Sequence, residues 1–401
     1  MRNIARSRWA AGLGLTVVSV LALTACSSGS SSSESSAAAS PAESSASESA
    51  APAPAECTTP TPVKLQLQWF AQAQFAGYYA AKDKGYYADQ CLDVTIVEGG
   101  VDIVPQTQLA QGNVDYAISW VPKALASREQ GAMITDVAQV FQRSGTLQVS
   151  WADSNIKTSA DFKGKKIGNW GFGNEFEIFA ALTKDGLDPA KDVTLVQQQF
   201  DMKGLLSRQI DAAEAMTYNE YAQLLEAKNE KTGKLNQPSD FNVVSYEAEG
   251  VGMLQDAIWA NGEKLSDAAY QAQTQAFVTA SLQGWIYCRD NAEDCAKIVT
   301  ANGSKLGASH QLWMMNEINK LIWPSPMGIG VADPKALAQT ITIATGTKNL
   351  EGATVLTAEP DPTWYTDTYA MAANAALQAM GLNTTGDAFA PITVTLLEGG
   401  N

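Results

Sequence analysis

Aromatic and amide side chains gather in residues 68–87, which read QWFAQAQFAGYYAAKDKGYY. A planar ligand stacked on an aromatic ring gains about 0.5–1.5 kcal/mol beyond the burial of area, and glutamine amides both donate and accept hydrogen bonds. These residue types suit a flat, neutral ligand better than an anion. The alternative is that the rings belong to the hydrophobic core, where aromatic residues are often buried. The candidate ligand-binding residues of this segment are Trp69, Gln72, Gln74, Phe75 and Tyr78.

Three later segments carry similar side chains, in the sequences YAISWVP, WGFGNE and MTYNEY. The glycines of WGFGNE allow a ligand to approach the backbone, and the polar side chains of MTYNEY could bind a polyol or an imide N–H. Each segment has a structural alternative: a buried tryptophan, a plain turn, or helix capping by an asparagine. The candidates are Trp120; Trp170, Phe172, Asn174 (also a candidate helix cap) and Glu175; and Tyr218, Asn219 and Glu220.

All four segments lie where a predicted β-strand ends. Residues 63–69, VKLQLQW, alternate apolar and polar side chains as a half-buried strand does. Further strands are predicted at residues 92–97, 114–120, 134–140, 147–152, 167–170, 193–196, 212–216, 242–246 and about 253–260, most of them separated by helices. This alternation is typical of βαβ units, whose ligands bind beyond the carboxyl ends of the strands. The four clusters should therefore converge on one cleft.

The length of the folded part indicates two lobes, because about 340 residues exceed what one hydrophobic core usually supports. We expect residues 63–153 and 254–401 to form lobe 1 and residues 154–253 to form lobe 2. The remainder after residue 260 is predicted to be mostly helical, with helices at residues 265–288, 292–301, 310–321 and 365–380. The predicted fold class is α/β, with two lobes, a hinge and a helical C-terminal region.

The first 62 residues predict export and a tether. Residues 1–25 contain three arginines followed by a short apolar run, as a signal peptide does. The sequence LTAC resembles a bacterial lipobox, and the resemblance implies that Cys26 is lipidated and anchors the protein on the extracytoplasmic face of the cell membrane. Ordinary secretion is the alternative. Residues 26–62 are rich in Ser, Ala, Pro and Glu, cannot bury enough apolar surface to fold, and predict a disordered tether.

Charge and cysteine content narrow the function further. A formal net charge of −15 argues against binding to nucleic acid. Four cysteines besides Cys26 predict disulfides in an oxidising compartment, with three possible pairings. Because Cys57 and Cys91 each precede one of two neighbouring parallel strands, and Cys288 and Cys295 flank a break between helices, we expect the pairs Cys57–Cys91 and Cys288–Cys295. Without a C-x-x-C motif, and with one histidine in the sequence, no metal site is expected.

The order and spacing of several motifs resemble the ABC-transporter solute-binding proteins of the aliphatic-sulfonate and thiamine-precursor superfamily. The motifs are the segment QWFAQAQFAGYYAAKDKGYYADQCLDVTIVEGG, then LAQGNVDYAISW, DFKGKKIGNWGFGNEFEIFAALTKDGLD and SRQIDAAEAMTYNEYAQLLE. The resemblance covers about residues 63–327 and implies a type II periplasmic-binding-protein fold that closes on a small molecule. AQAQFAGYY, QVFQRSG, FGNEF and AMTYNEY are most similar to the riboflavin-binding branch. A cysteine at position 91, where such proteins commonly carry glycine, departs from the pattern.

The expected function is capture of a neutral, riboflavin-like heterocycle by a monomer that delivers it to an ABC permease and its ATPase. A thiamine pyrimidine precursor is the first alternative and an aliphatic sulfonate the second. Capture of an anion usually needs arginine or lysine side chains at the site. Arg143 is expected near the hinge and the lysines of KGKK at the amino end of a strand, so the clusters have few cations nearby and an anionic ligand is disfavoured. Thiamine pyrimidine synthases share the fold, and resemblance to them would imply an active-site histidine, iron and a cysteine-rich run. Because we expect His310 outside every cluster, we predict no catalytic residue, no enzyme activity and no cofactor.

Overall fold

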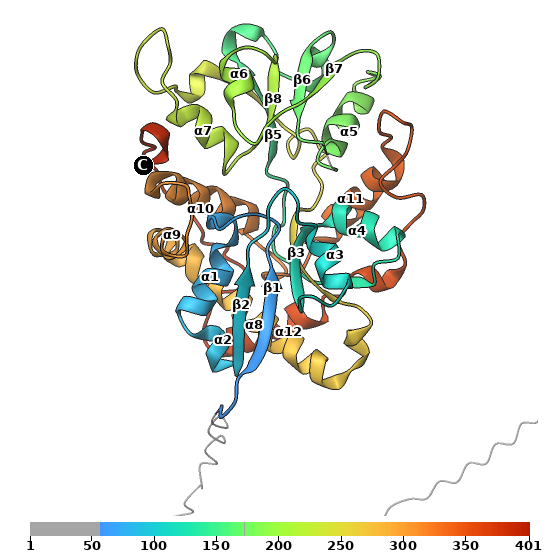
Figure 1. The fold of residues 1–401 in the computed structure, drawn as a ribbon, viewed down its shortest axis with the longest axis vertical. Coiled ribbons are helices and arrows are strands. Elements are labelled where there is room, and N and C mark those ends of the chain that lie inside the picture. Colours follow the sequence, from blue (N-terminus) through green and yellow to red (C-terminus); the bar gives the residue numbers. More distant parts are fainter. Residues whose placement is uncertain (1–56, 172) are drawn as a thin grey trace, which may run out of the picture. The chain divides into compact units, whose positions relative to one another are not determined.

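The computed structural model describes residues 57–171 and 173–401. The predicted signal peptide, Cys26, the tether as far as residue 56 and Phe172 lie outside the described residues. Two five-stranded sheets organise the described part (Figure 1).

The first sheet has the strand order β2-β1-β3-β10-β4. Its strands are β1 (Thr61–Gln66), β2 (Leu92–Val97), β3 (Tyr116–Trp120), β4 (Ile134–Gln139) and β10 (Asp256–Asn261). β1 is parallel to β2 and β3, whereas β10 is antiparallel to β3 and β4. The carboxyl ends of β1, β2 and β3 and the amino end of β10 therefore share one edge, and this edge carries two of the four candidate clusters.

The second sheet has the order β7-β6-β8-β5-β9. Its strands are β5 (Thr146–Trp151), β6 (Lys166–Asn169), β7 (Thr194–Gln197), β8 (Ala212–Met216) and β9 (Phe241–Ser245). β6 is parallel to β7 and β8, and β5 is antiparallel to β8 and β9. The other two candidate clusters follow β6 and β8.

The expected boundary after residue 153 is wrong for one strand. β5 was expected in lobe 1, but it forms all its pairs with β8 and β9 of the second sheet. The chain thus crosses between the sheets before β5, over residues 140–145, and returns over residues 246–255. A strand's pairing depends on distant partners, which local alternation of side chains does not report.

The two crossing segments are tied to each other. The side chain of Gln255 accepts a hydrogen bond from Gly145 N (2.9 Å) and donates one to Thr146 Oγ1 (2.8 Å). Glu247 Oε2 accepts from Ser144 N (3.0 Å). One glutamine therefore links the return segment to the outgoing one at the hinge.

Twelve α-helices occur in the described residues. They are α1 (Ala76–Asp83), α2 (Tyr86–Asp89), α3 (Pro105–Ala110), α4 (Val121–Glu129), α5 (Phe176–Lys184), α6 (Lys203–Leu206), α7 (Glu220–Glu226), α8 (Ala268–Asp290), α9 (Ala292–Ala301), α10 (Ala308–Ile322), α11 (Pro334–Gly346) and α12 (Thr368–Ala379). Of those described, α11 is the long C-terminal helix that was not predicted. Its sequence, PKALAQTITIATG, is rich in β-branched residues that weaken a helical pattern, and it is stabilised by burying Thr340, Ile341, Ile343 and Ala344.

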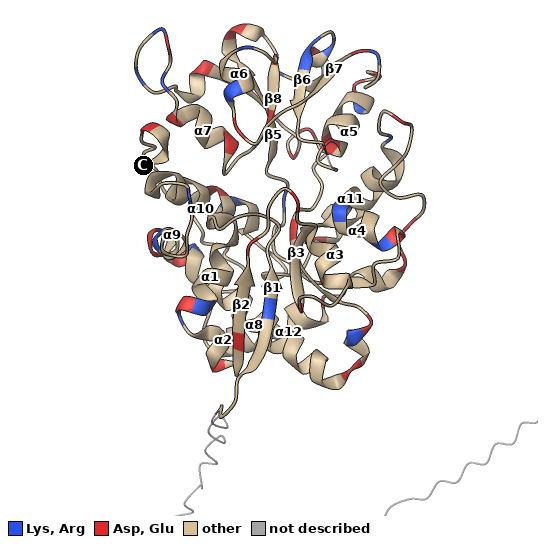
Figure 2. Ribbon diagram, viewed as in Figure 1, with Lys and Arg blue, Asp and Glu red and all other residues tan. Residues whose placement is uncertain are grey.

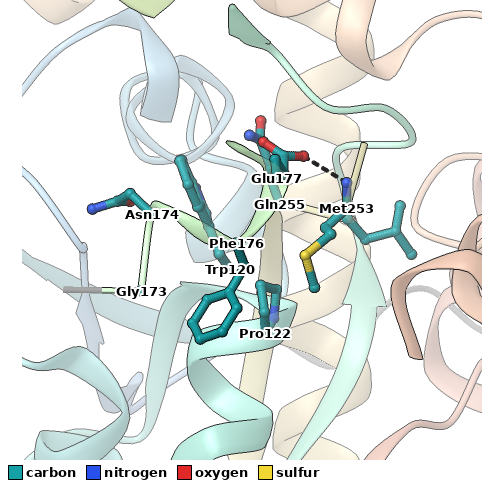
Figure 3. A pocket seen from close by; sticks show the side chains of 9 residues that line it. Trp120, Pro122, Gly173, Asn174, Phe176, Glu177, Met253 and Gln255 are labelled. Atoms are coloured by element: carbon teal, nitrogen blue, oxygen red, sulfur yellow. Dashed lines mark hydrogen bonds between the residues drawn. The ribbon is translucent and has the colours of Figure 1, made fainter. Parts of the chain in front are cut away.

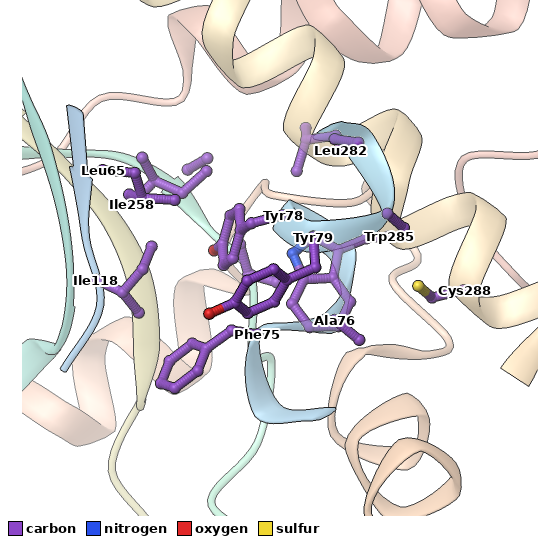
Figure 4. Packing of buried hydrophobic residues seen from close by; sticks show 14 of the residues in the cluster. Leu65, Phe75, Ala76, Tyr78, Tyr79, Ile118, Ile258, Leu282, Trp285 and Cys288 are labelled. Atoms are coloured by element: carbon purple, nitrogen blue, oxygen red, sulfur yellow. The ribbon is translucent and has the colours of Figure 1, made fainter. Parts of the chain in front are cut away.

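The core beside the first sheet depends on a close contact between α1 and α8 (Figure 4). A Cβ atom at Gly284 would lie 2.0 Å from the carbonyl oxygen of Gly77, and one at Gly77 would lie 2.2 Å from the Trp285 ring. Only glycine allows these helices to approach so closely. Leu65, Ile118 and Ile258 come from β1, β3 and β10, so the core continues from the helices onto the sheet.

Both expected cysteine pairs are disulfides in this structure. Cys57 and Cys91 join the segments that lead into β1 and β2, and Cys288 joins Cys295 across the break between α8 and α9. Cys91 adopts φ 57°, a left-handed conformation that favours glycine. The disulfide thus requires a cysteine at position 91, whereas the left-handed backbone favours glycine, the residue that the resembled proteins commonly carry there.

Basic and acidic residues are interspersed along the helices and loops around both sheets (Figure 2). None of the helices in the described part of the chain is long and apolar enough to span a membrane.

Candidate functional site

Aromatic rings from both sheets meet beyond the carboxyl ends of β1, β6 and β7. Trp69 follows β1, and its ring centroid lies 4.8 Å from that of Phe200, which follows β7. The Phe200 ring stacks at 13° on Trp170, which follows β6, with the centroids 6.3 Å apart. Phe70 adds an edge contact to Trp69 at 5.3 Å. Two predicted residues, Trp69 and Trp170, are therefore joined through a third ring, Phe200.

Amide side chains of the first cluster converge on Asp256, the first residue of β10. Gln74 Nε2 donates to both carboxylate oxygens (3.0 and 3.3 Å), and Gln68 Nε2 donates to Oδ1 at 2.5 Å. Gln72 Nε2 in turn donates to Gln74 Oε1 at 2.6 Å. Burial raises the pKa of Asp256 to about 7, against hydrogen bonds from the Gln74, Trp120 and Gln68 side chains, which lower it. The predicted amides thus form one network around a buried carboxyl group.

Phe75 and Tyr78 occupy the hydrophobic core. Both are buried, and the Tyr78 ring makes an edge contact with Trp285 of α8 at 5.6 Å (Figure 4). Burial raises the pKa of Tyr78 well above its ordinary value, so it is a neutral phenol at physiological pH. For these two residues the placement supports the core interpretation over the ligand-binding one.

Trp120, at the end of β3, is accompanied by a cation. The Lys123 ammonium lies 4.6 Å from the Trp120 ring. Burial lowers the pKa of Lys123 to about 8, against the attraction of Glu214, Glu175 and Asp256, which raises it. The expectation that the clusters lack nearby cations is therefore wrong at this position, because Lys123 lies on the first turn of α4 and is carried into the site by the helix.

The loop from Trp170 to Glu175 folds back on itself. Gly171 and Gly173 have φ values of 70° and 87°, which glycine adopts without strain. Asn174 Nδ2 donates to Gly171 O (2.7 Å), and Glu175 Oε2 accepts from Gly173 N (2.9 Å). Asn174 was expected to cap the following helix, but α5 has Glu175 at its N-cap position, without a side-chain capping bond. The asparagine closes the loop instead.

A second buried acid lies behind this loop. Glu214, in the middle of β8, accepts a hydrogen bond from Trp170 N (2.8 Å) through Oε2. Its side chain is fully buried, and burial raises its pKa well above the ordinary value. Glu214 thus holds the backbone of Trp170 in place.

The fourth cluster lies against the C-terminal helices. Glu220 Oε2 accepts from Met216 N (3.0 Å), and Asn219 Nδ2 donates to Glu220 Oε1 (2.9 Å). Tyr218 is buried and makes an edge contact with Phe141 at 6.5 Å. Burial raises the pKa of Glu220 to about 7. Asn219 occupies the N-cap position of α7, but no side chain accepts a capping hydrogen bond from the first turn of this helix. The alternative that these residues serve as helix caps therefore does not describe their contacts.

His310 belongs to this cluster, contrary to expectation. The histidine lies in α10 and is buried, with Nε2 3.1 Å from Asn219 Oδ1 and Nδ1 2.8 Å from Glu226 Oε1. It was expected outside every cluster because its sequence position is far from them. α10 packs against α7, and this tertiary contact brings the histidine to the second sheet.

A narrow pocket of about 10 Å³, close to the space of one water molecule, lies between α4, α5 and the returning hinge segment (Figure 3). Its walls include Trp120, Asn174 and Met253. Glu177, on α5, accepts a hydrogen bond from Met253 N at 2.6 Å. This bond connects the second sheet's helix to the segment that leads into β10.

Asp256, Phe200 and Lys123 were missed by the sequence reasoning. The rule that selected the other clusters, namely position after a strand, applies equally to Phe200 after β7. Asp256 begins β10, whose amino end lies beside the carboxyl ends of β1 and β3 because β10 is antiparallel to β3. Nothing in the β10 sequence, DAIWAN, marks that reversal. No group of three or more His, Cys, Asp or Glu side chains suited to a metal ion occurs among residues 57–171 and 173–401.

Comparison with known proteins places this geometry in a family. The family described as NMT1/THI5 like matches residues 72–295. A formylaminopyrimidine-binding protein of Halalkalibacterium halodurans is 22% identical over 235 residues, which cover 58% of this chain and 68% of the relative. The riboflavin-binding protein RibY of Chloroflexus aurantiacus is 29% identical over 218 residues, which cover 53% of this chain and 58% of the relative. The alignment therefore spans less than two thirds of the Chloroflexus protein.

Solved structures share the fold at low sequence identity. The periplasmic aliphatic sulphonate binding protein SsuA of Escherichia coli has a TM-score of 0.53 and 15% identity, with 86% of this chain and 96% of that chain covered. The periplasmic sulfonate-binding protein SsuA of Methylobacillus flagellatus KT has a TM-score of 0.55 and 15% identity, with 84% and 99% covered. The predicted α/β periplasmic-binding-protein fold is confirmed.

Proposed function

The chain belongs to the NMT1/THI5-like family, and on that premise we propose that it is the extracytoplasmic binding protein of an ABC importer. Its ligand is a neutral aromatic heterocycle of the riboflavin type, which it delivers to a permease. The signal peptide, the lipid anchor on Cys26 and the tether are parts of the same proposal. They would hold the folded part near the permease on the outer face of the membrane.

One observation carries the proposal: Trp69 from the first sheet and Trp170 from the second are brought together through Phe200. A flat ring system placed among these side chains would contact both sheets at once. Gln68, one of the amides held at Asp256, precedes Trp69 in the chain, and these amides would supply hydrogen bonds to heteroatoms. Binding would then favour the state in which the sheets are close, which is the condition for ligand-driven closure.

Contacts of the single histidine support binding over catalysis. Both ring nitrogens of His310 have hydrogen-bond partners, Glu226 and Asn219, within the protein. A general base needs a ring nitrogen within reach of a substrate proton. We therefore assign no catalytic residue.

Titration of the purified protein with riboflavin, a formylaminopyrimidine and an aliphatic sulfonate tests the proposal by calorimetry. Riboflavin is expected to bind most tightly. Binding of the pyrimidine without riboflavin would favour the second candidate, which the Halalkalibacterium relative suggests. Binding of the sulfonate alone would contradict the neutral-ligand proposal.

Replacement of Trp69 by alanine tests the aromatic wall. We expect Trp69→Ala to weaken ligand binding by about 1–3 kcal/mol, as removal of a central aromatic contact often does, without unfolding the protein. Trp151→Ala is the matched control, because Trp151 is also half-buried but pairs with Phe241 at the opposite edge of the second sheet. Equal affinity of Trp69→Ala and the wild type would return Trp69 to a purely structural role.

A further inference from the structure

Asp256 is buried within the first sheet's cleft edge and has no basic partner in a salt bridge among the described residues. The side-chain amides of Gln68 and Gln74 donate hydrogen bonds to it, and a hydrogen bond from the Trp120 side chain also lowers its pKa. An ionised carboxylate only accepts hydrogen bonds. Both glutamines must therefore turn their NH₂ groups toward Asp256 and their carbonyl oxygens away from it.

The orientation passes on to a third amide. With its NH₂ group on Asp256, Gln74 presents Oε1, and Gln72 Nε2 donates to this oxygen at 2.6 Å. Gln72 thereby turns its own carbonyl oxygen outward, so the chain of amides ends in an acceptor. The half-buried Gln68, next to Trp69, likewise presents its carbonyl oxygen. The carboxylate thus fixes the orientation of these amides, with the NH₂ groups directed toward Asp256 along the network and the carbonyl oxygens directed away from it.

A complementary donor lies at the end of β6 in the second sheet. The indole N–H group of Trp170 is buried and has no hydrogen-bond acceptor among the described residues, whereas the Trp120 side chain hydrogen-bonds the Asp256 carboxyl group. Buried polar atoms are rarely left without partners, so an unpaired donor beside the Phe200 ring indicates a ligand that accepts. The site therefore combines carbonyl acceptors from the glutamines with the indole donor of Trp170.

We propose that Asp256 is a positioning residue that orients Gln68, Gln74 and Gln72 so that the cleft selects a heterocycle bearing an N–H donor beside acceptor atoms. Cyclic imides and aminopyrimidines have this pattern, whereas a sulfonate offers acceptors alone and meets carbonyl oxygens that repel it. This inference rests on the proposed function and adds the hydrogen-bonding pattern of the ligand. Asp256 acts through the glutamines and does not contact the ligand.

The test compares riboflavin with 3-methylriboflavin, in which a methyl group replaces the imide N–H. We expect the wild type to bind riboflavin at least tenfold more tightly than the methylated compound. Asp256→Asn should reduce this ratio severalfold, because an asparagine can donate to one glutamine and invert it. If only the formylaminopyrimidine binds, its dimethylamino analogue takes the place of 3-methylriboflavin.

Asp136→Asn is the matched control. Asp136 is equally buried, lies on β4 of the same sheet, and its Oδ1 accepts from the backbone N of Ala138 at 3.0 Å and not from a glutamine. The ratio should stay at its wild-type value in this variant. Equal affinity of the wild type for riboflavin and 3-methylriboflavin would overturn the inference and leave the proposed function standing.

Side-chain amide NMR tests the network without any ligand. The Nε2 hydrogens of Gln74 should exchange slowly with solvent in the wild type and in Asp136→Asn, and faster in Asp256→Asn. Unchanged exchange in Asp256→Asn would refute the network even if no tested heterocycle binds. Protected amides combined with binding of the sulfonate alone would instead refute the proposed function and the inferred selectivity together.

The pH dependence gives a further readout. Titratable groups that face Asp256 are Lys123 on α4, Tyr78 on α1 and Tyr218 after β8. Burial raises the pKa values of both tyrosines, so they stay neutral near pH 7. Protonation of Asp256 would let it donate one hydrogen bond, so the preference for riboflavin over 3-methylriboflavin should decline below pH 7 and be insensitive to pH in Asp256→Asn. A preference that is constant from pH 5 to 8 in the wild type would contradict this role.

Discussion

Glu177 offers a direct test of buried charge in this protein. Its side chain is buried at the start of α5, and burial raises its pKa from 4.5 to about 7 against hydrogen bonds that lower it. Between these pH values the folded protein binds a proton that the unfolded chain has released. The free energy of unfolding therefore falls as pH rises through this window, by about 1.4 kcal/mol per pH unit for one proton.

Glu177→Gln removes this contribution. Over the window from 4.5 to about 7 the wild type should lose about 3 kcal/mol of stability through Glu177 alone. The variant keeps an oxygen that can accept from Met253 N, so the contact with the hinge segment survives. Asp256 and Glu220, also with pKa values of about 7, still contribute, so the slope becomes shallower by one proton without vanishing.

Urea denaturation followed by tryptophan fluorescence at pH 5, 6, 7 and 8 measures the slope. Glu351→Gln serves as the control, because it removes one carboxyl group from an exposed position. The same pH slope in Glu177→Gln and the wild type would show that Glu177 is ionised in the folded state throughout. Such a result would refute the reasoning from burial.

Three further predictions concern stability and are measured by urea denaturation. Gly284→Ala should lower the free energy of unfolding by several kcal/mol, because its Cβ would lie 2.0 Å from the carbonyl oxygen of Gly77. The control Gly346→Ala has nothing within 4 Å of the added Cβ and should raise the free energy of unfolding by about 0.4–1 kcal/mol. Similar effects of both substitutions would contradict the tight packing of α1 on α8. His310→Ala leaves Glu226 buried without its ring partner and should cost about 2–3 kcal/mol, and a cost near zero would mean that this contact adds nothing. Replacing Cys57 and Cys91 by serine should lower the free energy of unfolding by about 4 kcal/mol, and replacing Cys288 and Cys295 by about 2–3 kcal/mol. The first disulfide has the larger effect because it closes a loop with a sequence separation of 34, against 7 for the second. The reverse order would argue that loop entropy does not decide the stabilisation.

The fold was largely predictable from the sequence because strong local patterns coincide with its elements. β2 has the predicted bounds, Leu92–Val97, since the run LDVTIV is followed by one glutamate and then by two glycines. β1 ends at Gln66, three residues before the predicted end, although alternation continues to Trp69. The chain leaves the sheet there to bring Gln68 to Asp256 and Trp69 to Phe200, and no local pattern reports such contacts.

The candidate site was less predictable because its contacts join distant parts of the chain. Position after a strand selected Trp69, Trp170 and the amides, which the structure places in contact networks; that they bind a ligand stays a prediction. It could not distinguish Phe75, which is buried in the core. The roles of Asp256 and His310 depend on an antiparallel strand and on a helix-to-helix contact, neither of which leaves a signal in the neighbouring sequence.

Gln255 has a mechanical consequence. Because its side chain fastens the outgoing segment at Gly145 and Thr146 to the returning one, the two crossings cannot twist independently without breaking these bonds. Two chain segments fastened side by side behave as a ribbon, which bends across its flat face more readily than it shears in plane. The sheets would then approach each other by rotation about one axis, with Asp256, the next residue along the chain, near the pivot. In the proposed closure, an amide network anchored near the pivot would be displaced little, so its carbonyl oxygens would be available to a ligand before the sheets come together.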